Sequence, residues 1–211
     1  KRVTANLVER LSLPLYSTII LYGITELPGE NSVQDLVAYV KNGGGLYIIP
    51  DRSVNPVRFN ELFAPLLSGF QLGSAKSPDT PAFIDKNEAT VTQPLLLPLV
   101  REAWGEIEDI SFTTWFNVIN RGSAGCALRA DTGDMLAATI PLGRGHVYVQ
   151  LFSCDVRDGS MPRSPVFVPM VQEIINFLSR TEDQQERDVI RVNDMSRLKV
   201  SELRNVSGEA T

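Results

Sequence analysis

Two cysteines and one histidine are the residues of this sequence best suited to nucleophilic or metal chemistry: Cys126, Cys154 and His146. A cysteine nucleophile needs a base within hydrogen-bond reach to take up its proton. His146 and Cys154 belong to one predicted strand, GHVYVQLFSC, in which eight residues at about 3.3 Å each separate them by roughly 26 Å. The sequence therefore predicts no Cys–His dyad. These three residues also lack the number and spacing of zinc ligands, so we expect no metal.

A disulfide between the two cysteines is not expected either. The predicted hairpins place Cys126 opposite Thr139 and Thr139 opposite Val147, which leaves Cys154 beyond the paired residues. Free cysteines usually behave as small apolar residues of a core. We therefore predict two buried free thiols.

Charged and hydroxyl-bearing residues follow three predicted strands, at the edge where an open α/β sheet binds its ligands. They form one group after each strand: Thr25 and Glu26; Asp51, Arg52 and Ser53; and Asp155, Arg157 and Asp158. Carboxylates and guanidinium groups together predict a site for a small polar ligand or an ion. The competing interpretation is that they are solvated loop residues and helix caps. Ser53 has no histidine to activate it, so serine hydrolase chemistry is not expected.

A strand–helix–strand unit at 17–51 must position the second of these groups. The apolar run at 17–24 predicts a strand buried on both sides, and Leu46–Ile49 predicts a second buried strand. Between them, Ser32 and Asp35 predict a capping box and Asn42-Gly43 predicts a helix end. The apolar face of that helix has the spacing i, i+3, i+4 and i+7: Val33, Leu36, Val37 and Val40. Such a unit predicts a right-handed parallel crossover.

The residues that follow predict a second helix and an excursion from the sheet. Asn55-Pro56 is a good helix start, and Pro65 is expected to shorten or bend the helix near its end. The segment at 68–95 is rich in Gly, Ser, Pro and Thr and predicts a lid or an edge with one short strand at 82–84. Residues 95–104 predict a short helix.

Four strands and a helix are predicted in the second half of the chain. Turn residues at 131–134 and 141–145 separate apolar runs at 112–119, 126–129, 135–140 and 146–152, which predicts an antiparallel meander beside the parallel sheet. The helix has one apolar stripe: Phe167, Met170, Val171, Ile174, Ile175 and Leu178. The predicted fold class is therefore α/β, with a parallel sheet core extended by an antiparallel β-meander.

Composition restricts the classes of partner. A net charge of −5 disfavours nucleic acid and anionic membranes, and no apolar run approaches the roughly 20 residues that span a bilayer. We expect one domain at 1–180 and a charged linker, or the start of a following domain, at 181–211. A chain that begins at Lys1 in helical sequence is interpreted as a fragment of a longer protein.

Three stretches resemble the class I glutamine-amidotransferase-like domains: YVKNGGGLYIIPD at 39–51, NPVRFNELFAPLL at 55–67, and LGRGHVYVQLFSCD with FVPMVQEIINFL at 142–155 and 167–178. The resemblance is greatest to the non-catalytic version in large bacterial membrane proteins of the aerotolerance-regulator type. The helix-GGG-strand motif also occurs in trehalose-utilisation-type and β-galactosidase trimerisation domains of that superfamily. The resemblance implies a flavodoxin-like three-layer sandwich in a protein that other segments anchor in the cell envelope.

The sequence departs from the catalytic members of that family at one position. They carry a cysteine between glycines on a sharp strand-to-helix turn, with His and Glu completing a triad. Here that turn reads Pro50-Asp51-Arg52-Ser53, and no Gly-x-Cys-x-Gly occurs anywhere in the chain. We therefore predict no catalytic residues and no cofactor.

The expected function is a non-enzymatic interaction or scaffolding domain that binds protein partners or other domains of the same chain. Two alternatives stay open: a small-molecule or carbohydrate-binding module at the strand edge, and a degenerate amidotransferase-like hydrolase. An exposed apolar patch favours the interaction domain. Carboxylates with strongly shifted pKa values in a closed cleft favour the hydrolase.

Overall fold

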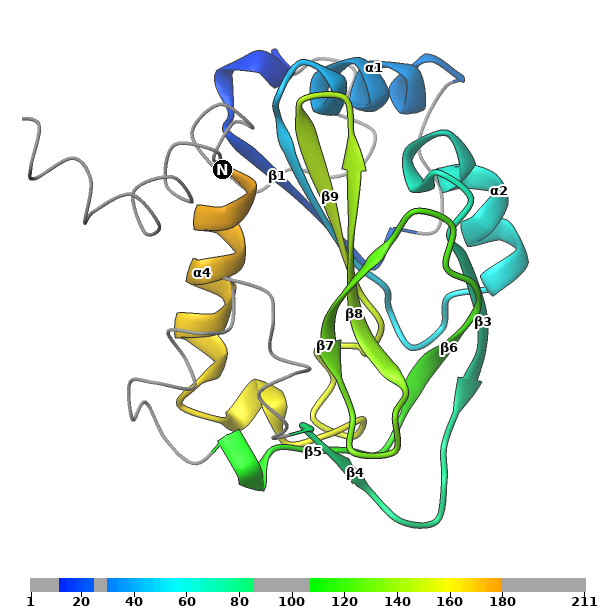
Figure 1. Ribbon diagram of the computed structural model, residues 1–211, viewed down its shortest axis with the longest axis vertical. Helices are drawn as coiled ribbons and strands as arrows, with labels where there is room; N and C mark the ends of the chain where they lie inside the picture. The colour runs from blue at the N-terminus through cyan, green and yellow to red at the C-terminus, as the bar shows by residue number, and fades with distance from the viewer. Residues whose placement is uncertain (1–11, 25–29, 86–106, 180–211) are drawn as a thin grey trace, which may run out of the picture.

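A five-stranded mixed sheet forms the centre of the structure, a computed structural model that describes residues 12–24, 30–85 and 107–179 (Figure 1). The strand order is β1-β2-β9-β8-β7. These strands are β1 (Thr18–Tyr22), β2 (Gly45–Ile49), β7 (Gly125–Arg129), β8 (Met135–Leu142) and β9 (Gly145–Gln150). β1, β2 and β9 are parallel to one another, whereas β8 and β7 continue the sheet in antiparallel fashion. The predicted α/β class and the predicted β7–β8–β9 meander are confirmed.

The β1–α1–β2 unit has the predicted parallel strands and intervening helix. Helix α1 (Glu30–Lys41) ends as expected, with Gly43 at a φ of 104° and its N–H donating to the carbonyl of Val40 at 2.9 Å. The predicted cap at Ser32 is wrong. The helix already begins at Glu30, so Ser32 lies within its first turn, where it is buried.

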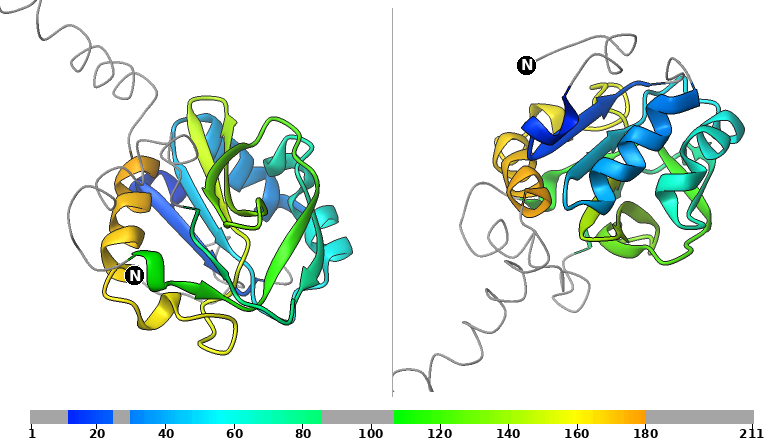
Figure 2. Two further views of the ribbon diagram at one scale, coloured as in Figure 1. Left: turned by 60° about the horizontal axis from the view of Figure 1, so that its bottom comes forward. Right: turned by 90° about the horizontal axis from the view of Figure 1, so that it is seen from above.

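Helices cover both faces of the sheet, so alternate residues of one strand enter different cores. Leu46 and Ile48 of β2 pack with α1 and α2 (Pro56–Leu67), whereas Tyr47 and Ile49 pack with α4 (Phe167–Leu178). Figure 2 shows α4 on the opposite side of the sheet from α1 and α2. This alternation explains why all five residues of β2 are buried.

Helix α2 begins where the sequence predicts. The Asn55 side chain accepts hydrogen bonds from the main-chain N–H groups of Val57 and Arg58 at 3.0 and 3.3 Å, as an N-cap does. Pro65 lies inside this helix, which continues to Leu67. Its buried face includes Phe59, Phe63, Leu66 and Leu67.

The strand β1 is not buried on both sides, contrary to the prediction. It is the edge strand of the sheet, and Ile20 and Tyr22 are 45% and 52% exposed. The reason is the position of α4, which packs over β2 and β9 rather than over β1. An uninterrupted apolar run therefore belongs here to a strand whose second face is only partly covered.

The excursion after α2 contains a strand that the sequence analysis missed. β3 (Gln71–Lys76) pairs with β6 (Trp115–Asn120) in a separate two-stranded sheet. β4 (Ala82–Phe83) is the short strand predicted near 82–84, and it pairs with β5 (Ser111–Phe112). The single strand predicted at 112–119 is thus two strands in different sheets. The short 3-10 helices are η2 (Leu13–Leu15), η3 (Ile107–Asp109) and η4 (Met161–Arg163).

The hairpin registers differ by one residue from the prediction. Cys126 lies opposite Ala138, and Thr139 lies opposite Tyr148 rather than Val147. Shifts in the β7–β8 register explain why counting back from the turn fails for Cys126.

Several predictions fall outside the described residues. They are the helix at 95–104, the residues Thr25 and Glu26, the part of the 68–95 excursion after Asp85, and the segment at 181–211. Within the described residues no helix is both long and apolar enough to cross a membrane.

Candidate functional site

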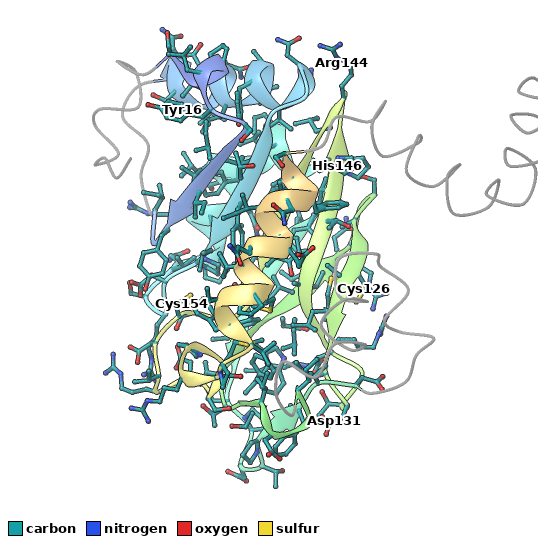
Figure 3. The ribbon with its side chains drawn as sticks, turned by 90° about the vertical axis from the view of Figure 1, so that its left-hand side faces the viewer. Tyr16, Cys126, Asp131, Arg144, His146 and Cys154 are labelled. Carbon is teal, nitrogen blue, oxygen red and sulfur yellow. The ribbon has the colours of Figure 1, made fainter. Side chains whose placement is uncertain are left out.

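The strands β1, β2 and β9 end at one edge of the sheet and bring the predicted site residues together there. Cys154 lies toward this edge and His146 toward the opposite one, as Figure 3 shows. The expectation that these two residues cannot share a proton is confirmed. Both cysteines are free, as predicted, but they are only partly buried, contrary to the prediction.

The loop after β2 is held by Asp51. Its Oδ1 accepts the Ser53 N–H at 3.0 Å and the Ser53 hydroxyl at 3.3 Å. An aspartate that accepts from the residue two positions later forms an Asx turn. Asp51 and Ser53 therefore interact with each other, in the arrangement expected of turn residues.

The loop after β9 contains a second turn of this kind. Asp155 Oδ1 accepts the Arg157 N–H at 2.9 Å, and Arg157 Nε lies 3.0 Å from both carboxylate oxygens. The Arg157 side chain folds back on Asp155, and these hydrogen bonds hold the pKa of Asp155 well below its usual range. Asp155 in turn raises the pKa of Arg157. The side chain of Arg157 is 70% exposed, so the pair lies at the surface and not in a closed cleft.

Asp158 ties three loops together, a role that its place in the sequence does not reveal. Its side chain is only 2% exposed, accepts the Ser153 hydroxyl at Oδ2 and lies 3.5 Å from Arg52 Nη1 at Oδ1. Its carbonyl accepts the N–H groups of Thr113 and Thr114 at 2.9 and 3.2 Å. A buried carboxylate is stable only when it is paired and hydrogen-bonded. Asp158 meets this requirement by linking the loops after β2 and β9 to the start of β6.

A chain of polar side chains leads from this edge into the sheet, and the sequence analysis missed it. The Tyr47 hydroxyl donates to Gln150 Oε1, and Gln150 Nε2 donates to the Phe152 carbonyl at 2.8 Å and lies 3.6 Å from Cys154 Sγ. Burial raises the pKa of the Cys154 thiol, against the opposing effect of the Gln150 hydrogen bond. A thiol with a raised pKa is a poor nucleophile at neutral pH. The signal that could have revealed these connected polar side chains was Gln150, a polar residue in an apolar strand.

Tyr22 joins the group from β1. Partial burial raises its pKa, and the neighbouring ionisable groups of Cys154, Asp51 and Asp155 add to that rise. These groups are therefore near enough to sense one another. The edge thus assembles Tyr22 and those predicted site residues that lie in the described part of the chain: Asp51, Arg52, Ser53, Asp155, Arg157 and Asp158.

The arrangement favours a structural interpretation of these charges. Asp51, Asp155 and Asp158 each already accept hydrogen bonds from the chain, and the arginines lie beside Asp155 and Asp158. Among the described residues no group of three or more His, Cys, Asp or Glu side chains has a metal-binding arrangement.

Two hollows of the described part lie away from this edge. One of about 610 Å³ lies at the opposite edge and is lined by residues of η2, α1 and the turn before β2, including Leu13, Tyr16, Tyr39 and Gly44. The other, of about 460 Å³, is lined by residues that include Lys76, Trp115, Asp131 and Asp134. In this second hollow Lys76 Nζ and Asp134 Oδ1 form an ion pair at 2.7 Å, and Asp131 Oδ1 accepts the Phe83 N–H at 3.0 Å.

Comparison with known proteins identifies shared architecture only. No family model and no curated protein matches the sequence. A cytoplasmic protein from Salmonella typhimurium is similar in structure, with a TM-score of 0.60 and 16% identity over 81% of this chain and 74% of its own. A second cytoplasmic protein, from Salmonella typhimurium LT2, has a TM-score of 0.57 and 15% identity over 85% of this chain and 77% of its own. At these identities the chain shares with both proteins a mixed α/β fold and nothing finer.

Proposed function

We propose that this chain is a non-enzymatic interaction domain that binds a protein partner through the exposed side of β1. The observation that carries the proposal is the exposure of apolar side chains on this edge strand and in the η2 turn before it. Leu15, Ile20 and Tyr22 are 81%, 45% and 52% exposed. Burying apolar surface of this kind against a partner is favourable, and contiguous exposed apolar side chains mark interaction sites.

The carboxyl edge supports this proposal over a degenerate hydrolase. The turn after β2 presents Asp51, Arg52 and Ser53 where the catalytic relatives need a cysteine. The pKa of Asp155 is lowered by an arginine at the surface, whereas a general acid or base needs a pKa near the working pH. A small-molecule or carbohydrate module is also less favoured, because a ligand at this edge must displace the hydrogen bonds of Asp51 and Asp155.

The proposal includes a family and a place in a larger protein. The helix-GGG-strand unit supports a flavodoxin-like three-layer sandwich of the glutamine-amidotransferase-like type, in its non-catalytic, aerotolerance-regulator form. Burial of alternate β2 residues against α1 and α2 and against α4 is consistent with that architecture. In this proposal the domain covers 1–180, the segment at 181–211 is a linker, and other parts of the protein anchor it in the cell envelope.

Photo-crosslinking in the native cell tests the proposed surface. A photoreactive amino acid replaces Ile20 in one variant and Val57, a 64% exposed residue of α2, in a matched control. We expect a discrete adduct from position 20 that is lost in a Tyr22→Lys background, and no adduct from position 57. Absence of a discrete adduct at position 20 contradicts the proposal. Release of ammonia from glutamine by the purified protein contradicts its non-enzymatic part.

A further inference from the structure

The main-chain groups on the outer side of β1 are available for strand pairing. No described strand pairs with that side. On the inner side, Gly45 N–H donates to the Ser17 carbonyl at 3.0 Å and Gly23 N–H donates to the Ile49 carbonyl at 2.9 Å. Because successive residues of a strand direct these groups to opposite sides, Thr18, Ile20 and Tyr22 direct theirs outward.

Within the described residues this edge lacks three devices by which natural sheets prevent pairing: charged side chains, prolines and bulges. All residues from Ser12 to Ile24 are uncharged, β1 contains no proline, and its register with β2 runs without a bulge from Thr18 to Tyr22. Charges, prolines and bulges are the usual protections of an edge strand. β1 is therefore a straight, neutral strand with an open edge.

The opposite edge of the same sheet is protected, so pairing with another strand is expected at β1 and not at β7. Strand β7 has two register shifts and ends in Arg129. The segment after β4 also covers it in part, through a bridge between Ile84 and Ala130 and a hydrogen bond of 3.0 Å from Asp85 N–H to the Arg129 carbonyl.

Apolar side chains accompany the open edge on the α4 side of the sheet. The β1–β2 register places Ile20 beside Tyr47 and Tyr22 beside Ile49, and both β2 residues belong to the core under α4. Figure 3 shows β1 lying beside α4 and not under it. A strand added to β1 would therefore cover Ile20 and Tyr22 as well as the main-chain groups.

We propose that β1 pairs with β1 of a second copy of this chain, antiparallel, about a two-fold axis at Ile20. In this arrangement Ile20 lies opposite Ile20 of the partner subunit, and Thr18 lies opposite Tyr22 of the partner subunit. The outward main-chain N–H and C=O groups of Thr18, Ile20 and Tyr22 in one copy then form hydrogen bonds with those of the other copy. This inference rests on the proposed interaction function and names its partner.

A second copy fits this edge because the edge is self-complementary. The outward residues are symmetric about Ile20, so one two-fold operation closes the assembly. The chain has a net charge of −5, and β1 is a neutral stretch along which two like-charged copies can approach. A strand without charges also offers a charged foreign peptide no ion pair.

The proposed register makes a distance prediction. Directly opposed residues of a hydrogen-bonded antiparallel pair have Cα atoms about 5.5 Å apart, which is within the roughly 4.4–6.8 Å that a disulfide spans. Thr18 and its symmetry mate would be four residues out of register, about 13 Å apart along the strands. Only particular cysteine pairs can therefore form a crosslink.

Disulfide trapping tests this register in a Cys126→Ser, Cys154→Ser background. We expect Ile20→Cys to give a covalent dimer under mild oxidation and Thr18→Cys alone to give none. A mixture of the Thr18→Cys and Tyr22→Cys proteins should again crosslink. Equal crosslinking by Thr18→Cys and Ile20→Cys, or no crosslinking by Ile20→Cys, overturns the proposal.

Light scattering of the otherwise unchanged protein gives an independent measurement. We expect twice the mass of the chain at tens of micromolar, and an increase of at least about 100-fold in the dimer Kd for Ile20→Lys, which places two ammonium groups at the axis. Val57→Lys, the matched control on α2, should leave the dimer unchanged. A wild-type monomer, or a dimer that Ile20→Lys does not weaken, contradicts the pairing.

The two proposals fail in different ways. If the protein is monomeric but still forms a β1-specific adduct with another polypeptide in the cell, the interaction function stands and the pairing with a second copy is wrong. If no β1-specific adduct of any mass forms, both the interaction function and the pairing with a second copy are wrong.

Discussion

At the scale of single residues, the carboxyl edge is a place where charges stabilise loops. Asp51 and Asp155 each form an Asx turn, and the Asp158 carboxylate, shielded from water, accepts the Ser153 hydroxyl and pairs with the charge of Arg52. The three carboxylates differ mainly in burial, since Asp158 alone is buried. Their contributions to stability should therefore differ.

Asp158→Ala should destabilise the fold by about 2 kcal/mol, because it leaves the buried Ser153 hydroxyl without its acceptor and removes the partner of Arg52. Asp158→Asn keeps an acceptor oxygen and should cost less. Urea unfolding measures both changes. The exposed Arg157→Ala is the control, expected within about 0.5 kcal/mol of the unchanged protein. An Asp158→Ala loss no larger than that of Arg157→Ala would show that Asp158 does not tie the loops together.

Asp155 should titrate below the ordinary aspartate value of 3.8, chiefly because Arg157 donates hydrogen bonds to it. Its folded pKa lies below its unfolded pKa, so ionised Asp155 favours the folded state above the unfolded pKa. That contribution is lost as pH falls through the folded pKa. Arg157→Ala removes the side-chain hydrogen bonds and should raise the midpoint toward 3.8, while the main-chain N–H of residue 157 and the charge of Arg52 still lower it. Carboxyl NMR shifts measure the midpoint, and an unchanged value in Arg157→Ala would exclude Arg157 as the cause.

At the scale of elements, close approach between α4 and β2 depends on one glycine. A Cβ at Gly45 would lie 2.5 Å from Leu178 Cβ and would also overlap the Leu178 carbonyl oxygen. The hairpin between β8 and β9 approaches α1 in a similar way. Arg144 donates to the carbonyls of Lys41 and Asn42 and so satisfies acceptors at the end of that helix.

Gly45→Ala should destabilise the fold by about 2 kcal/mol, because the end of α4 must move away from the sheet. Gly133→Ala is the comparison: this turn residue has a φ of 86° but no neighbour within 4 Å of an added Cβ, so only backbone strain of about 1 kcal/mol is expected. Thermal and urea unfolding of both variants measure the difference. Equal losses would mean that the packing of α4 on Gly45 is unimportant.

At the scale of the whole molecule, one sheet separates two cores and places its unprotected edge at the surface. α1 and α2 pack on one face and α4 on the other, and α4 leaves part of β1 uncovered. The proposed dimer would double the sheet across that edge and leave the charged carboxyl edge free. In this arrangement the interaction surface and the carboxyl edge are different parts of the molecule.

Local periodicity was enough to predict much of this fold. The stripes of α1, α2 and α4, the Asn55 cap and the hairpins around β8 follow from neighbours a few residues apart. The gathering of Asp51, Arg52, Ser53, Asp155 and Arg157 was also predictable, because parallel strands end at one edge. The amino-acid sequence by itself also determines that the turn after β2 carries no cysteine.

Only the tertiary structure decided which surfaces are covered. β1 and β2 have similar apolar runs in the sequence. They differ in burial because α4, a helix more than 140 residues after β1, packs over β2 and not over β1. The pairing of β3 with β6, the burial of Asp158 and the chain from Tyr47 to Cys154 likewise depend on distant segments. Burial and strand partners are long-range properties. The sequence therefore predicts β1 as a strand, and the folded molecule makes it an open edge.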